Sequence, residues 1–223
     1  MTANVTPTAR SAPPAKGTQA ERSASMRQRL LDSAITCLCR VGYAATTTQL
    51  VMDEAGVSRG AMLHHFPTKV DLVIAVGEYA ASSQNRYVRT KLEGLHGLDR
   101  YLAITPATWE AVCQPPALAL VEIMVASRSD QALGARFPDV IERLQTRQLN
   151  DVCELALECG MKDRGTIERM VRLHRAAMRG LAMELMFSGD RAGADASMEL
   201  LEWYKRILTG NLVTGLGEPL FET

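Results

Sequence analysis

Two adjacent histidines, His64 and His65, are the first candidates for chemistry in this sequence, because imidazole can bind a metal ion or transfer a proton near neutral pH. They lie in the segment AGVSRGAMLHHFPTK, which reads as a short helix. Neighbouring side chains of a helix point about 100° apart, so the two rings cannot converge on one ion, and no other histidine lies nearby in the sequence. We therefore predict that neither histidine holds a metal ion or acts in catalysis.

The five cysteines and the short motifs also argue against an active site. The cysteines are odd in number, and Cys37 and Cys39 would point about 200° away from each other on a helix. We expect reduced, buried thiols. The chain has no glycine-rich phosphate loop, no His-Glu-x-x-His and no Gly-x-Ser-x-Gly motif. The sequence therefore predicts no catalytic residues, no cofactor and no metal site.

The elements that position the remaining residues are predicted to be helices. The chain is 47% hydrophobic but only 5% aromatic, and good helix formers outweigh β-branched and aromatic strand formers. Net charge is zero, yet residues 1–72 carry eight basic against five acidic side chains. This pattern favours an all-α protein with a basic N-terminal module on a mildly acidic body.

The first 24 residues are rich in Pro, Ala, Ser and Thr, and we expect them to form a disordered tail. They contain no apolar stretch of the kind found in signal peptides, and no part of the chain approaches the ~20 apolar residues of a membrane span. We therefore expect a cytoplasmic protein without a membrane partner.

Three helices are predicted after this tail. Apolar residues recur at helical spacing over 26–41. The hydroxyl residues Thr46–Thr48 can cap a short second helix that ends at Gly56, and Ser58 can cap a third that Pro67 terminates. Glycine readily accepts the positive φ of a sharp turn between the last two helices. This order predicts a DNA-binding helix-turn-helix. Longer helices are expected over residues 68–95, 98–113, 115–127, 138–159, 166–188 and 194–211.

The stretch from the first helix through TTTQLVMDEAGVSRGAMLHHFPTKVDLV resembles the TetR family of transcriptional regulators, over about fifty residues. The resemblance implies a homodimer with nine to ten helices per subunit that binds double-stranded operator DNA of palindromic sequence. It also implies release from that DNA by a small, largely apolar ligand. Residues 25–71 would form the DNA-binding domain and residues 72–223 the ligand-binding and dimerisation domain.

The resemblance also assigns the residues that contact DNA. Arg59 can bind guanine through two hydrogen bonds, and Gly60 permits close approach to the major groove. Lys69 matches the family's phosphate-contacting lysine. Leu63 departs from the family pattern, which usually has a tyrosine there; leucine cannot donate that tyrosine's hydrogen bond to phosphate but can contact a thymine methyl group. The expected contacts are Thr47, Thr48, Gln49, Ser58, Arg59, Gly60, Leu63, His64 and Lys69.

No motif marks a ligand site in the C-terminal part, but its methionines and few aromatic side chains could line an adaptable apolar cavity. Core packing is the alternative interpretation for each of them, and Arg128 beside Asp130 is more typical of a structural ion pair. The candidate ligand-binding residues are Tyr101, Trp109, Cys113, Met124, Arg128, His174 and Met178.

The last two predicted helices have broad apolar faces, which need a partner surface. The resemblance implies that the partner is the same pair of helices from a second subunit. The candidate interface residues are Met178, Leu181, Leu185, Leu201, Tyr204 and Leu208. Two alternatives stay open: a DNA-binding regulator that responds to no small molecule, and an all-α enzyme or ligand carrier that uses the histidines and the cavity.

Overall fold

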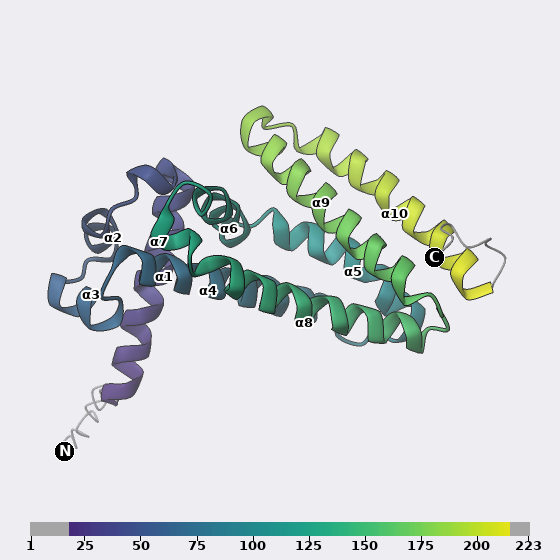
Figure 1. Ribbon diagram of the computed structural model, residues 1–223, viewed down its shortest axis with the longest axis horizontal. Coiled ribbons are helices and arrows are strands. Elements are labelled where there is room, and N and C mark those ends of the chain that lie inside the picture. Colours follow the sequence, from purple (N-terminus) through teal and green to yellow (C-terminus); the bar gives the residue numbers. More distant parts are fainter. Residues whose placement is uncertain (1–17, 215–223) are drawn as a thin grey trace, which may run out of the picture.

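The computed structural model describes residues 18–214, which form ten helices and no strand (Figure 1). The prediction of an all-α protein is therefore confirmed. Within the described residues no single helix is long and apolar enough to cross a membrane, and α5 with α6 would do so only as a pair bent by 77°. The helices are α1 (Gln19–Ala45), α2 (Thr48–Ala55), α3 (Arg59–His65), α4 (Lys69–Lys91), α5 (Gly97–Val112), α6 (Pro115–Ala126), α7 (Gln131–Gly134), α8 (Phe137–Glu158), α9 (Arg164–Ser188) and α10 (Arg191–Thr214).

The first helix begins earlier than the sequence analysis predicts. Thr18 accepts a hydrogen bond from the backbone N–H of Glu21, and the Glu21 side chain accepts one from the backbone N–H of Thr18. This reciprocal capping box stabilises a helix start at Gln19. The predicted disordered tail is therefore wrong for residues 18–24, and its residues 1–17 lie outside the described part of the chain.

Near its other end α1 is interrupted at Gly42, whose φ of 72° is in the left-handed region. The helical spacing of apolar residues in the sequence likewise ends at residue 41, just before this glycine. The interruption carries the chain into Tyr43, a half-buried residue that contacts three other elements. Its backbone N–H donates to Glu122 of α6, its hydroxyl donates to Asp130 before α7, and its carbonyl accepts from Lys69 of α4.

One continuous core joins the N-terminal helices to the next part of the chain. Buried apolar side chains of α1, α2, α3 and α4 form a single cluster with those of α6, α7 and α8. Two smaller clusters lie among α5, α8, α9 and α10. Figure 1 shows α2 and α3 at one end of the molecule and α9 beside α10 at the other, with α4 and α8 running between them. The helix α4 therefore belongs to both halves.

The short helix α7 is absent from the predicted elements. At four residues it is too short to show a hydrophobic period, and it is held by Asp130, whose carboxylate accepts from the backbone N–H of Leu133 at 3.0 Å. The same carboxylate accepts the hydroxyl of Tyr43. No ion pair joins Asp130 to the exposed Arg128 in the described residues, so the predicted ion pair is wrong.

Candidate functional site

The turn between α2 and α3 has the geometry that the sequence analysis predicts. Gly56 has a φ of 62° and ends α2, and the backbone N–H of Val57 returns to the carbonyl of Met52 at 3.1 Å. From α1, Arg29 donates to the carbonyl of Ala55, one of the carbonyls that a helix end leaves without a partner. These contacts fix the angle between the two helices of the helix-turn-helix.

The helix α3 presents a polar and small-residue face to solvent. Ser58 caps it by accepting from the backbone N–H of Ala61 at 3.3 Å, and Arg59 and Gly60 follow at its exposed start. On the opposite face Met62 is buried in the core. No hydrogen bond or ion pair within the described residues engages the Arg59 side chain, which leaves its guanidinium free to bind a partner.

Farther along α3 the two histidines differ in environment. His64 is exposed together with Leu63, whose side chain is 47% exposed. His65 is half-buried, and burial lowers its pKa, with the charges of His64 and Arg27 lowering it further. Phe66 is buried, and the Arg27 guanidinium lies 5.3 Å from its ring centre. The exposed pair Leu63 and His64 therefore extends the face that begins at Arg59.

The start of α2 presents a second part of the predicted DNA surface. Thr47 caps the helix through its hydroxyl, which accepts from the backbone N–H of Leu50 at 3.1 Å. Thr48 is half-buried, and Gln49 is exposed and donates to Asp53 at 2.7 Å. A helix N-terminus with free backbone N–H groups is suited to bind phosphate.

Lys69 is less free than the family resemblance implies. Its ammonium group donates to the carbonyl of Tyr43 at 2.9 Å and lies 4.1 Å from the centre of the Tyr43 ring. Burial lowers its pKa, and the charge of Asp130 partly offsets that effect. The Lys69 side chain is therefore held against Tyr43, and a phosphate contact requires it to share or exchange this bond.

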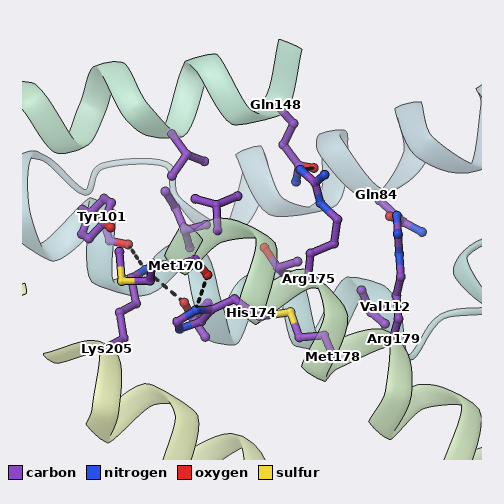
Figure 2. A pocket seen from close by; sticks show the side chains of 15 residues that line it. Gln84, Tyr101, Val112, Gln148, Met170, His174, Arg175, Met178, Arg179 and Lys205 are labelled. Carbon is purple, nitrogen blue, oxygen red and sulfur yellow. Dashed lines mark hydrogen bonds between the residues drawn. The ribbon is translucent and has the colours of Figure 1, made fainter. Parts of the chain in front are cut away.

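A cavity of about 90 Å³ lies in the other half of the molecule, lined by fifteen residues of α4, α5, α8, α9 and α10 (Figure 2). Three of the seven predicted ligand residues line it: Tyr101, His174 and Met178. The structure does not bring the other four to this cavity: Trp109, Cys113, Met124 and Arg128. Helical periodicity identifies buried residues but does not say which of several clusters each one joins.

The four misplaced residues have other surroundings. Trp109 and Cys113 pack in the cluster near the start of α10, where the indole N–H of Trp109 donates to Asp195 at 2.6 Å. Met124 packs against the N-terminal core, and Arg128 is exposed after α6. The prediction that they share one cavity with His174 is therefore wrong.

Lys205 is the buried charged group of the cavity, and the sequence analysis does not single it out. The side chain is 4% exposed, and its ammonium group donates to the carbonyl of Tyr101 at 2.6 Å and to the hydroxyl of Thr105 at 3.0 Å. Burial lowers its pKa to about 7, against a smaller raising effect of Glu202. A lysine at a core position between Met198 and Leu208, on an otherwise apolar helix face, is the signal that could have found it.

Two further side chains of the cavity wall, His174 and Tyr101, each bury one polar atom that has no hydrogen-bond partner among residues 18–214. His174 is 6% exposed, and its Nδ1 lies 2.8 Å from the carbonyl of Met170, which as an acceptor requires the proton on Nδ1. Its Nε2 is then a free acceptor, and neither this atom nor the hydroxyl of Tyr101 has a hydrogen-bond partner. Burial lowers the pKa of His174. Buried polar atoms without partners cost free energy, which a bound molecule could recover.

The outer faces of α9 and α10 carry a large apolar surface. Met178 and Leu208 do not belong to it, because they are only 3% and 7% exposed inside the chain's own core, so their prediction as interface residues is wrong. Leu181, Leu185 and Leu201 are half-buried, and Tyr204 is exposed. The most exposed apolar residues were not predicted: Leu173, Met186, Phe187, Leu200, Trp203 and Ile207.

Comparison with known proteins finds a family model that matches the helix-turn-helix region of the chain. The model of the family described as "Bacterial regulatory proteins, tetR family" matches residues 30–76, which run from the core of α1 into α4. A crystal structure of a transcriptional regulator from Rhodococcus sp. Rha1 has the same fold, with a TM-score of 0.66 over 85% of this chain and 96% of that chain at 16% identity.

Two curated relatives are transcriptional regulators. The chain is 28% identical over 179 residues to the HTH-type transcriptional regulator CymR of Pseudomonas putida, which covers 80% of this chain and 88% of CymR. It is 30% identical over 87 residues to the HTH-type transcriptional repressor AcnR of Corynebacterium glutamicum, which covers 36% of this chain and 46% of AcnR. These relatives are not enzymes. The chain belongs to the tetR family of bacterial regulatory proteins and is a DNA-binding transcriptional regulator.

Proposed function

We propose that this regulator is a homodimeric repressor that binds a palindromic operator through α2 and α3 and leaves it when a small molecule fills the cavity. The observation that carries the proposal is the pairing of two surfaces on one rigid helix. The helix α4 begins at Lys69, beside the helix-turn-helix, and carries Gln84 in the cavity wall.

DNA recognition is proposed for the exposed face of α3. The major groove distinguishes all four base pairs, and Arg59 is free to bind a guanine edge there. Gly60 adds no side chain that would hold the helix away from the bases. The proposed contacts to phosphate come from the start of α2 at Thr47 and Thr48, and from Lys69 once it exchanges its bond to Tyr43.

Dimerisation is proposed for the outer faces of α9 and α10. A groove between these helices is lined by Leu173, Leu181, Leu200 and Trp203, and the side chain of Trp203 is 60% exposed. A contiguous apolar surface of this kind is costly in water. A second copy of the same face is the proposed occupant, because a two-fold dimer would present two recognition helices about 34 Å apart, matching successive turns of DNA.

Ligand binding in the cavity is proposed to change DNA affinity through α4. Phe137 at the start of α8 packs directly on Gly77 of α4, and Arg136 forms an ion pair with Asp71 at 2.9 Å. A ligand that changes how α8 and α9 pack would therefore move α4. The protein would then have two arrangements, one that fits DNA and one that fits the ligand. The ligand can change the free energy of DNA binding only by the difference between its own binding free energies for these two arrangements, about 1–3 kcal/mol in typical cases.

The first test replaces Arg59 by alanine and measures binding to DNA from upstream of the regulator's own gene by fluorescence anisotropy. Arg59→Ala should weaken operator binding by about 1–3 kcal/mol and relax the preference at one base pair. The matched control is Arg89→Ala, which removes an exposed arginine at the far end of α4. Unchanged operator affinity and base preference in Arg59→Ala would contradict the assignment of α3 as the recognition helix.

The second test addresses assembly. Leu200→Asp places a charge in the centre of the proposed interface, where it would be buried without a partner, so the variant should be monomeric at concentrations at which the wild type is dimeric. Light scattering measures the mass of both proteins. A monomeric wild type at micromolar concentration would refute the dimer. Ligand response is tested separately, by loss of the DNA complex when a ligand found by thermal-shift screening is added.

A further inference from the structure

The cavity wall has an unbalanced charge. Among its fifteen lining residues, four can carry a positive charge, namely His174, Arg175, Arg179 and Lys205, and none is aspartate or glutamate. The carboxylate of Glu202 affects Lys205 from outside this wall. A cavity that bound only neutral, apolar molecules would have no use for four such groups, and each costs free energy to bury.

Two of these groups, Arg175 and Arg179, lie one helical turn apart on α9 and face the same way (Figure 2). Arg175 donates to the side-chain oxygen of Gln145 at 3.0 Å and to that of Gln148 at 3.5 Å, both on α8. These partners are neutral, so the charge of Arg175 is solvated but not balanced. Burial lowers the pKa of both guanidinium groups, and the charge of Arg175 lowers that of Arg179 further.

Arg179 has no partner at all among residues 18–214: no hydrogen bond or ion pair engages its guanidinium. Figure 2 shows its side chain extended toward Gln84 of α4, while Arg175 extends toward Gln148 of α8. A half-buried guanidinium without a partner, next to a second one, is an arrangement that an anion would stabilise.

The rest of the wall defines the body of the molecule that would bring this anion. Val112, Met170 and Met178 line the cavity near the arginines and His174, and methionine adapts to ligands of different shape. A free volume of about 90 Å³ suits one ring or a short alkyl chain. The free acceptor Nε2 of His174 and the hydroxyl of Tyr101 are then available to a polar substituent.

We propose that the effector is a small organic carboxylate, an apolar body of one ring or a short chain whose carboxylate binds Arg179 and Arg175. The planar guanidinium matches a carboxylate through two parallel hydrogen bonds. A phosphate is less suitable, because it carries a second charge and a third oxygen, whereas Val112 and Met178 near the arginines offer no hydrogen bond. A cation would be repelled by the wall. The inference rests on the proposed response to a small molecule and adds the chemical class of that molecule.

The test measures binding of matched compounds to the full-length protein by calorimetry. The probes are 3-phenylpropanoate and octanoate, each compared with its primary amide, its amine and the phosphonate of the same skeleton. The wild type should bind at least one of the two carboxylates roughly tenfold more tightly than its amide and phosphonate, and should not bind the amines. Failure to bind either carboxylate, or equal binding of the amides or amines, would overturn the proposal.

The variant Arg179→Gln removes the charge and keeps a shorter polar side chain that can still donate hydrogen bonds. It should lose roughly tenfold in affinity for the carboxylate while its affinity for the amide stays the same. The matched control is Arg172→Gln, which removes an exposed arginine from the same helix and should bind both compounds as the wild type does. A carboxylate preference that persists in both Arg179→Gln and Arg175→Gln would overturn the assignment to these residues.

Failure of this inference can be distinguished from failure of the proposed function. A carboxylate that binds and is sensitive to Arg179→Gln, yet leaves the DNA complex intact, supports the ligand class and refutes induction. Release of DNA by an uncharged or cationic compound supports induction and refutes the ligand class.

Discussion

Replacing Lys205 by methionine should stabilise the folded regulator and change the way its stability depends on pH. Methionine has nearly the same length and is apolar, so it fits the space between α10 and α5 without the cost of a buried charge. The ammonium group of Lys205 has neutral oxygens of Tyr101 and Thr105 as its hydrogen-bond partners, and it lies 4.3 Å from the centre of the Tyr101 ring. Neither partner compensates the loss of hydration, which is why its pKa is lowered from 10.5 to about 7.

The sign of the effect follows from this direction. Between the folded-state and unfolded-state pKa values the unfolded chain binds the proton and the folded chain does not, so stability rises with pH over that range. The lowered pKa of Lys205 corresponds to a cost on the order of 4 kcal/mol at pH 7, which falls to about 1 kcal/mol near pH 9.5. The wild type should therefore gain about 3 kcal/mol relative to Lys205→Met over this range. At pH 7 the variant should be more stable by about 2–3 kcal/mol, because the hydroxyl of Thr105 loses a donor worth about 1 kcal/mol.

The measurement is urea unfolding of both proteins at fixed concentration, at several pH values from about 7 to 9.5. Fixed concentration matters because dimerisation would add to the apparent stability. The control is Lys91→Met, which removes an exposed lysine whose pKa is raised, first by its hydrogen bond to Glu110. A raised pKa contributes stability that is lost only as pH rises through the higher, folded-state value. The difference in unfolding free energy between the wild type and Lys91→Met should therefore stay constant over the measured pH range. If the difference in unfolding free energy between the wild type and Lys205→Met were also constant with pH, the conclusion that Lys205 is buried with a lowered pKa would be refuted.

Two further substitutions test how the halves of the molecule are joined. Gly77→Ala places a methyl group 2.5 Å from the ring of the fully buried Phe137. The free energy of unfolding, measured in urea, should therefore fall by about 1–3 kcal/mol. An unchanged urea midpoint would show that the ring can move aside. Tyr43→Phe removes the hydroxyl that donates to Asp130 and should lower the free energy of unfolding by about 1–2 kcal/mol in the same assay. The control Tyr79→Phe should leave it unchanged. Equal decreases in the two variants would show that the contact with Asp130 does not stabilise the fold.

Much of the N-terminal half could be predicted from the sequence because its signals are local. The cap at Ser58, the glycine at position 56 and the stop before Pro67 each depend on a few neighbouring residues, and the structure places all three as predicted. The start of α1 was missed because its cap, Thr18 with Glu21, lies within a segment whose composition is typical of disorder.

The C-terminal site could be predicted only in part, because it depends on contacts between distant residues. Periodicity places Met178 on a buried face, but it does not tell whether that face meets α5 or a second subunit, and the structure shows the first. Trp109 was expected in the cavity and instead donates to Asp195, 86 positions away in the chain. The contact between Lys205 and Tyr101 likewise joins residues 104 positions apart.

The junction around Tyr43 has a consequence for the engineering of biosensors. The cavity residues all lie C-terminal to α2 and α3, so under the proposed function operator choice and ligand choice would be encoded in separate segments that can be exchanged. An exchanged N-terminal module must still bring a hydroxyl to Asp130, as Tyr43 does, and a carboxylate to Arg136, as Asp71 does. A hybrid that keeps these two contacts should transmit the ligand signal to a new operator, whereas one that lacks them should bind both DNA and ligand without linking the two.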